Sequence, residues 1–256
     1  AQAIAAKVLV VAGTLNRYPD RDAVSLRSKL AEFVNGISGT SMKSENIWAA
    51  NGSNEIIQSL FLAFGGGSAI GFTPSYSMHP LIARVCQVAW TNGSRRADYS
   101  LDIDSAIAQI QSSKPSLTFI TTPNNPTGSA VTLDEIEKLA INTPGLLVVD
   151  EAYAEFSDEV SALTLIEKYQ HVVVIRTMSK AFSFAGARVG YLVAHQSVID
   201  AMFLVRLPYH LSALTQAAAE VALDFSTELL ATVDQLRTAR NQMAQELEDL
   251  GLHVLP

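Results

Sequence analysis

Five short runs of apolar residues recur along the chain, each about the length of a buried β-strand. Between most of them lie stretches whose apolar positions repeat at helical spacing. One helix is expected to begin at Thr132, because Thr132 and Glu135 have the spacing of a capping box. Near-continuous apolar strands that alternate with helices are typical of an α/β fold, with a mostly parallel central sheet sandwiched by helices. The expected strands cover residues 69–73, 117–122, 146–150, 172–176 and 189–194.

The pattern changes after about Pro208, where the chain becomes helical almost to its end. The last stretch has apolar positions at helical spacing, and Gly251 follows it as a helix stop signal. We therefore expect a large α/β domain over residues 16–207, with 1–15 and 208–256 forming the linking helix and parts of a smaller domain. The final residues, GLHVLP, resemble the start of a strand, so the C-terminal remainder of the smaller domain is expected to follow them.

Charge and composition limit which molecules and ions the protein is expected to bind. The net charge is −7 and the sequence pI is about 5.2, which argues against binding to nucleic acid or to an anionic membrane. No apolar run approaches the roughly 18 residues that span a bilayer. The single cysteine, Cys86, excludes an internal disulfide and favours a reducing, cytoplasmic location. The five histidines show no paired metal-ligand spacing, so no metal site is expected.

Polar residues follow three of the expected strands directly, at the edge where the carboxyl ends of parallel strands meet and ligands bind. Asn125 lies in PNNPTG after one strand, Asp150 ends LLVVD, and Lys180 follows VVVIR. A lysine beside a buried strand is costly unless its charge is neutralised, paired or used. Such a lysine can act as an amine nucleophile and form a Schiff base with a carbonyl compound.

Groups suited to a phosphate surround this lysine in the sequence. Thr177 and Ser179 supply hydroxyl donors and Arg188 supplies a fixed cation. The stretch NGSNEII, residues 51–57, is a small-residue turn that opens a helix, where backbone N–H groups can hold phosphate oxygens. Pyridoxal 5′-phosphate carries both a carbonyl and a phosphate, and its ring nitrogen needs a carboxylate, for which Asp150 is suited. Taken singly, each feature is more often a turn, a cap or a solvated side chain.

Five motifs occur together in this order: NGSNE, PSYSMHP, TTPNNPTG, DEAYAEF and RTMSKAFSFAGARVGY. They resemble the fold-type-I aminotransferases that depend on pyridoxal 5′-phosphate, and more narrowly the histidinol-phosphate aminotransferase family of histidine biosynthesis, over residues 16–256. The resemblance implies the fold of type I PLP-dependent transferases and a homodimer with shared active sites. It also implies transamination of L-histidinol phosphate, a phosphorylated amino alcohol, with a 2-oxo acid such as 2-oxoglutarate.

The resemblance also implies roles for individual residues around the cofactor. Lys180 would bind it covalently and act as the acid–base group, and Asp150 would pair with its ring nitrogen. Asn125 and Tyr153 would hydrogen-bond its ring oxygen, and Tyr76 would stack on the ring. The implied catalytic residues are Lys180, Asp150 and Tyr153. The implied phosphate ligands are Ser53, Asn54, Thr177, Ser179 and Arg188.

Substrate residues are also implied by the resemblance. Tyr18 matches the tyrosine that reaches the cofactor of the neighbouring subunit, and Tyr209 would lie on the substrate side. Tyr76 and Asn125 would contact the substrate as well. His79 and His210 stand beside motif tyrosines and are candidates for the pocket wall. The family's arginine for the substrate's carboxylate or phosphate has no match here. The late arginines Arg206, Arg237 and Arg240 do not sit in that motif.

Three other functions stay open on the sequence. An aromatic amino acid aminotransferase shares every cofactor residue, and a phosphothreonine decarboxylase of the same fold differs only in which bond at Cα is broken. A non-catalytic PLP-binding domain of a transcription regulator would need a DNA-binding module. The chain shows neither a basic helix-turn-helix nor a net positive charge, so that function is disfavoured.

Overall fold

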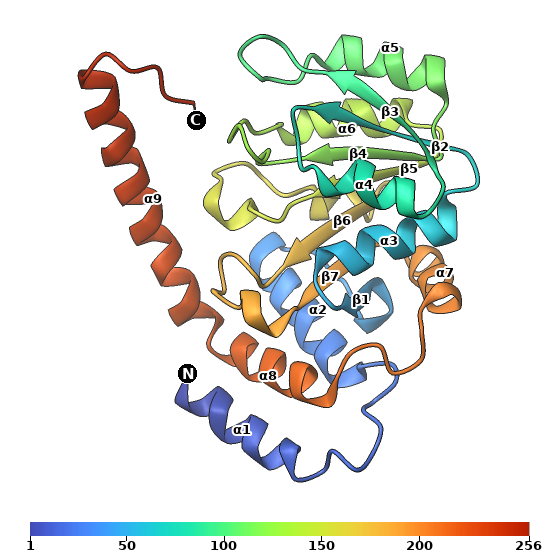
Figure 1. The fold of residues 1–256 in the computed structure, drawn as a ribbon, viewed down its shortest axis with the longest axis vertical. Coiled ribbons are helices and arrows are strands. Elements are labelled where there is room, and N and C mark those ends of the chain that lie inside the picture. The colour runs from blue at the N-terminus through green and yellow to red at the C-terminus, as the bar shows by residue number, and fades with distance from the viewer. Residues whose placement is uncertain (256) are drawn as a thin grey trace.

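The computed structural model describes residues 1–255, which contain a seven-stranded sheet in the order β1-β7-β6-β5-β4-β2-β3 (Figure 1). β7 alone runs antiparallel to its neighbours, and the other strands are parallel to one another. The mostly parallel α/β sheet expected from the apolar pattern is therefore confirmed. The strands are β1 (Ile47–Ala50), β2 (Ser68–Thr73), β3 (Ala89–Ser94), β4 (Leu117–Thr121), β5 (Leu146–Asp150), β6 (Val172–Thr177) and β7 (Gly190–Val193).

All five strands expected from the sequence are present, within one or two residues of their expected ends. β1 and β3 were not expected. The capping box at the start of α6 (Leu133–Asn142) is confirmed, since the Thr132 side chain accepts from the Glu135 backbone and Glu135 reaches back to the Thr132 backbone. The helix expected in 51–57 is α3 (Ser53–Phe64).

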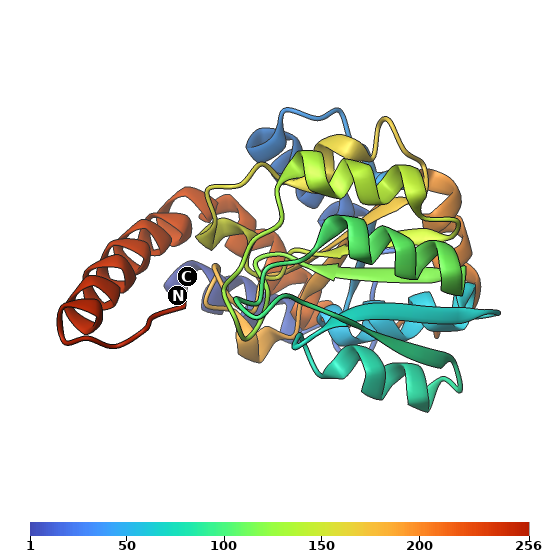
Figure 2. The same ribbon diagram turned by 90° about the horizontal axis from the view of Figure 1, so that it is seen from above.

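Helices cover both faces of the sheet, as Figure 2 shows for α4 and α6 on opposite sides of the strands. Alternate strand residues point to opposite faces. Val148 and Val173 pack with α3, α4 (Met78–Val85) and α7 (Gln196–Val205). Val149 and Val174 pack in the second core, with α2 (Val24–Ser38), α5 (Ile103–Ser113) and α6. The result is a three-layer sandwich whose strands are buried on both sides, which explains their continuous apolar sequences.

The two ends of the chain lie beside the sandwich. α1 (Gln2–Ala12) packs against α8 (Ala213–Asp224), and α9 (Ser226–Asp249) extends away from the sheet (Figure 1). Gly251 follows α9 with φ 81°, as its expected role as a stop signal requires. The expected strand at GLHVLP is wrong for residues 252–255, because no neighbouring strand pairs with them, and Pro256 lies outside the described residues.

The division into a large domain and parts of a smaller one stays a prediction. None of the helices described in residues 1–255 combines the length and the apolar composition that crossing a bilayer requires.

Candidate active site

A pocket lies at the edge of the sheet where the parallel strands end. β4, β5 and β6 deliver their carboxyl ends to this edge, and so does β1, because β1 and β6 both run antiparallel to β7. The fold brings ten of the residues expected from the sequence into the pocket wall. These are Ser53, Asn54, Tyr76, Asn125, Asp150, Tyr153, Thr177, Ser179, Lys180 and Arg188. Thr121 and Ala152 complete the wall; they lie in the motifs TTPNNPTG and DEAYAEF, but no role was expected for either.

Lys180 lies on the loop after β6, and its side chain is exposed. Lys180 follows the buried strand β6, as expected, but it is not buried itself, because the chain leaves the sheet after Thr177 and turns at Lys180, whose carbonyl accepts from Ser183 N at 2.8 Å. Lys180 Nζ lies 5.2 Å from the centroid of the Tyr153 ring. Among residues 1–255 the lysine ion pairs involve Lys29 and Lys168, so the Lys180 amine is available to a ligand.

Asp150 ends β5 and is buried beneath the pocket. Its Oδ2 lies 3.0 Å from His79 Nε2 on α4, and its Oδ1 accepts from Ala152 N at 3.2 Å. His79 is itself buried and packs against the Phe119 ring, with 4.8 Å between centroids. It therefore lies behind Asp150 and outside the expected position on the pocket wall. These contacts fix a carboxylate that suits a protonated ring nitrogen.

The N-terminus of α3 forms another part of the wall. Gly52 is its N-cap, with φ 79° and no side chain to cap the helix, so the first backbone N–H groups have no partner within the helix. A Cβ on Gly52 would lie 2.6 Å from Arg188 Nη2, and a Cβ on Gly190 would lie 2.6 Å from Ser53 N. The Arg188 guanidinium and β7 therefore both approach this helix end closely. Free N–H groups beside a guanidinium are well suited to a phosphate.

Hydrogen bonds within the wall hold several of the expected ligands in place. The Thr177 hydroxyl donates to Val189 O and accepts from Ser179 N, each at 3.1 Å. Its hydrogen is already used, so in this arrangement Thr177 shapes the loop that carries Ser179 and does not offer a free donor. The Tyr76 hydroxyl donates to Asn54 Oδ1 at 3.1 Å, which fixes the position of the Tyr76 ring.

Tyr18 and Tyr209 do not line this pocket. Their rings stack on each other, with 4.4 Å between centroids and 19° between planes, and their exposed fractions are 80% and 41%. His210 also lies away from the pocket wall, because its ring stacks on Trp48 and its Nε2 lies 2.9 Å from Ala49 O. The expectation that His210 lines the pocket is therefore wrong, and the two tyrosines form a separate exposed pair.

Comparison with known proteins places the chain in a family. Residues 1–256 match the family described as aminotransferase class I and II. The chain is 53% identical to the histidinol-phosphate aminotransferase of Corynebacterium glutamicum, over 99% of this chain and 70% of that one. It is 52% identical to the same enzyme of Rhodococcus opacus, over 99% and 67%. The chain belongs to the histidinol-phosphate aminotransferase family.

A solved structure has the same fold. The histidinol-phosphate aminotransferase of Sinorhizobium meliloti, solved in complex with pyridoxal-5′-phosphate, matches with a TM-score of 0.88. The match covers 100% of this chain and 70% of that one, at 24% identity. This likeness confirms the fold of type I PLP-dependent transferases for the three-layer sandwich and its mostly parallel sheet.

Pyridoxal 5′-phosphate is the cofactor of the histidinol-phosphate aminotransferase family, and the pocket fits it. The donor set includes a buried carboxylate at Asp150 for the ring nitrogen and an exposed amine at Lys180 for the carbonyl. The uncapped N-terminus of α3 with Arg188 suits the phosphate. Each chemical feature of the cofactor therefore has a matching group in the wall.

Proposed function

We propose that this protein transaminates L-histidinol phosphate, with 2-oxoglutarate as the amino acceptor. The observation that carries the proposal is the 53% identity, over 99% of the chain, with a relative that bears the name histidinol-phosphate aminotransferase. The pocket supports it, because one wall holds a lysine, a buried carboxylate and an anion-binding helix end. These groups suit a PLP-dependent reaction at an amine carbon.

Each residue of the pocket would have a role set by the part of the cofactor or substrate that it contacts. Bound pyridoxal 5′-phosphate would act as an electron sink for the bond broken at the substrate's Cα. Lys180 would hold the cofactor between turnovers and carry the proton to and from Cα during the reaction. Asp150, held by His79, would keep the ring nitrogen protonated. Asn125 and Tyr153 would bind the ring oxygen.

The phosphate of the cofactor and the phosphate of the substrate need separate sites. Ser53, Asn54, Ser179 and Arg188 would hold the cofactor's phosphate, and Tyr76 would stack on its ring. The substrate's phosphate would be met by tyrosine hydroxyls from a neighbouring subunit. The exposed pair of Tyr18 and Tyr209 supplies such hydroxyls on the surface, which supports a homodimer with shared sites. We also propose a cytoplasmic location, in keeping with the single cysteine.

A panel of half-reactions on the PLP-loaded full-length protein tests the proposal. The visible absorption of the lysine-bound cofactor is followed after addition of histidinol phosphate, phenylalanine or phosphothreonine. Histidinol phosphate is expected to remove the band with the highest efficiency of the three, at least about tenfold above phenylalanine. A higher efficiency with phenylalanine would make the protein an aromatic amino acid aminotransferase. Release of carbon dioxide from phosphothreonine would make it a decarboxylase.

A further inference from the structure

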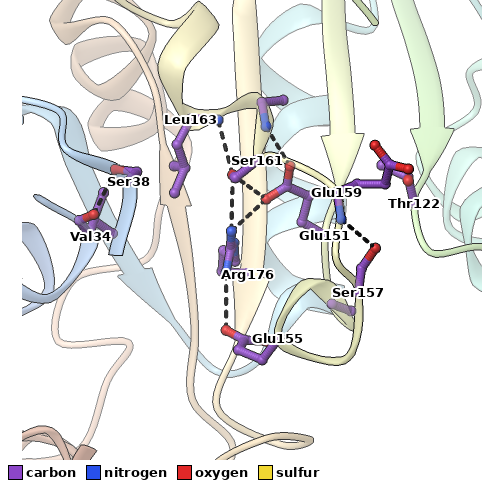
Figure 3. Close-up of polar contacts among 12 residues, drawn as sticks. Val34, Ser38, Thr122, Glu151, Glu155, Ser157, Glu159, Ser161, Leu163 and Arg176 are labelled. Atoms are coloured by element: carbon purple, nitrogen blue, oxygen red, sulfur yellow. Dashed lines mark hydrogen bonds and ion pairs between the residues drawn. The ribbon is translucent and has the colours of Figure 1, made fainter. Parts of the chain in front are cut away.

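A buried ion network lies behind the pocket wall, between β5, β6 and the loop that follows β5 (Figure 3). The Arg176 side chain, 4% exposed, is its centre. Arg176 Nη2 lies 2.7 Å from Glu151 Oε2, and Arg176 Nη1 lies 3.0 Å from Glu155 Oε1. Arg176 Nη2 also donates to Ser161 Oγ at 2.9 Å. One planar guanidinium therefore joins two carboxylates and a hydroxyl, which a lysine ammonium on a flexible stem does not reproduce.

The network fixes the far end of the same loop as well. Glu151 Oε1 accepts from Ala162 N at 2.7 Å, and Glu151 Oε2 accepts from Ser161 Oγ at 2.7 Å. The Glu151 backbone N–H donates to Ile175 O at 2.9 Å. Both ends of the segment 151–162 are therefore attached to β6 through Glu151 and Arg176.

The three charged members of the network lie within two positions of a pocket-wall residue along the chain. Glu151 directly follows Asp150, and Arg176 directly precedes Thr177 at the start of the loop to Lys180. Glu155 lies in the short 3-10 helix η2 (Ala154–Phe156), which begins right after Tyr153. Phe156 N donates to Tyr153 O at 3.0 Å, so a displacement of η2 moves Tyr153. Arg176 touches none of the reacting groups itself, and acts on them only through the backbone.

The charges in the network do not balance when both carboxylates are ionised. Burial raises the pKa of Glu155, although the Arg176 cation acts in the opposite direction. Burial alone would lower the pKa of Arg176, but Glu151 and Glu155 raise it overall, so Arg176 stays charged. Tyr191 pairs with Arg176 across β6 and β7, and burial raises the pKa of its hydroxyl, so it adds no charge. Loss of Arg176 would leave Glu151 buried without a cation.

We propose that Arg176 is a positioning residue, which holds Asp150 and Tyr153 in register with Lys180 by joining Glu151 to Glu155. The proposal rests on the proposed aminotransferase function, in which Tyr153 binds the ring oxygen beside the Lys180 linkage. Small displacements of groups that contact a reacting centre lower the rate strongly, even when the substitution is distant. Arg176 thus links the ends of two strands into one rigid support for the pocket.

The test compares Arg176→Lys with the wild-type full-length protein, both loaded with PLP. The pH titration of the visible band reports the pKa of the Lys180 linkage without any substrate. Arg176→Lys is expected to shift that midpoint by about one pH unit, because Tyr153 would no longer hydrogen-bond the ring oxygen of the cofactor in the same geometry. It is expected to lower kcat about 10- to 100-fold, with KM within about twofold.

Two substitutions at Glu155 keep the test decisive if Arg176→Lys does not fold. Glu155→Gln retains an oxygen that accepts from Arg176 Nη1, so its band midpoint is expected to match that of wild type and its kcat to stay within about twofold. Glu155→Ala removes the acceptor and is expected to show the Arg176→Lys effects in weaker form. Equal band midpoints and equal kcat for Glu155→Gln and Glu155→Ala would overturn the proposal.

Arg27→Lys is the matched control. Arg27 is also buried, on α2, and donates to Ser44 O and Ile47 O without lining the pocket. Its substitution is expected to lower Tm and leave the band midpoint unchanged. A fall in Tm without a change in midpoint or kcat in Arg176→Lys would reduce Arg176 to a purely structural role. Because the band titration needs no substrate, its result is separate from the identity of the amino donor.

Discussion

Glu155 is a buried carboxyl group near the pocket wall that makes the stability of the fold depend on pH. Its side chain is 10% exposed and lies 3.0 Å from Arg176 Nη1. Burial raises its pKa above the usual value of 4.5 in spite of that cation. The folded protein therefore holds this proton more tightly than the unfolded chain does. The carboxyl favours folding below about pH 4.5, and this contribution is lost as the pH rises through the raised pKa.

Glu155→Gln is therefore expected to raise the free energy of unfolding at pH 7 to 8, where the wild type bears the cost of a buried carboxylate. The gain should vanish near pH 4.5, where the wild-type carboxyl is protonated in the folded state. Urea unfolding of both proteins across this range measures the difference. A variant that is less stable than wild type at pH 7 would show that Arg176 holds Glu155 ionised at a net gain.

At the residue scale, sequence motifs located most of the pocket but not its internal contacts. Ten expected residues meet in one wall, because they follow strands whose carboxyl ends share an edge. The contact of His79 with Asp150 joins residues 71 positions apart, and no spacing rule connects them. The role of Arg176 was missed for a similar reason. In the sequence it is only the last residue of an apolar run, and its carboxylate partners come from a separate loop.

At the element scale, all five strands that the sequence predicted contribute buried residues to both cores. β5 and β6 have continuous apolar runs because helices cover both of their sides. β1 is four residues long, too short to stand out as a run. β3 is one of the two edge strands of the sheet, and most of its residues, AWTNGS, are exposed, so its sequence is polar. Its position comes from pairing with β2, which the sequence does not encode locally.

The N-terminus of α3 is expected to bind the phosphate of the cofactor. Gly52 adopts φ 79°, and a Cβ there would lie 2.6 Å from Arg188 Nη2. Gly52→Ala is therefore expected to displace the guanidinium and strain the first turn, and to raise the Kd for pyridoxal 5′-phosphate about tenfold. Fluorescence titration of the protein with the cofactor measures the change.

Gly36→Ala is the matched control for this substitution. Gly36 lies within α2, where a Cβ meets nothing within 4 Å. Replacing a helical glycine there should raise the free energy of unfolding by about 0.5–1 kcal/mol and leave the Kd unchanged. Equal cofactor affinity in Gly52→Ala and wild type would mean that the end of α3 does not bind the phosphate.

At the scale of the whole molecule, exposed leucines lie close in the sequence to the stacked pair of Tyr18 and Tyr209. Leu204 lies in the last turn of α7 and Leu207 lies in the loop before Tyr209; they are 87% and 77% exposed, and Leu15 is exposed just ahead of Tyr18. Exposed apolar side chains in such numbers are typical of a surface that another protein covers. Both tyrosines lie outside the pocket of their own chain. A second copy that covers this surface would accept them into its own pocket, as the proposed homodimer requires.

Mixing two inactive chains tests this arrangement. One chain carries Lys180→Ala and the other Tyr18→Ala, and the two are unfolded together in equal amounts, refolded and loaded with pyridoxal 5′-phosphate. In a mixed dimer with shared sites, one site combines the intact Lys180 of one chain with the intact Tyr18 of the other. Half of the dimers are mixed and each has one intact site, so roughly a quarter of the wild-type activity should return. If Tyr18 served the pocket of its own chain, the mixture would show no more activity than the average of the two variants. A Lys180→Ala chain mixed with a chain carrying both substitutions has no intact site in any dimer, and should stay inactive.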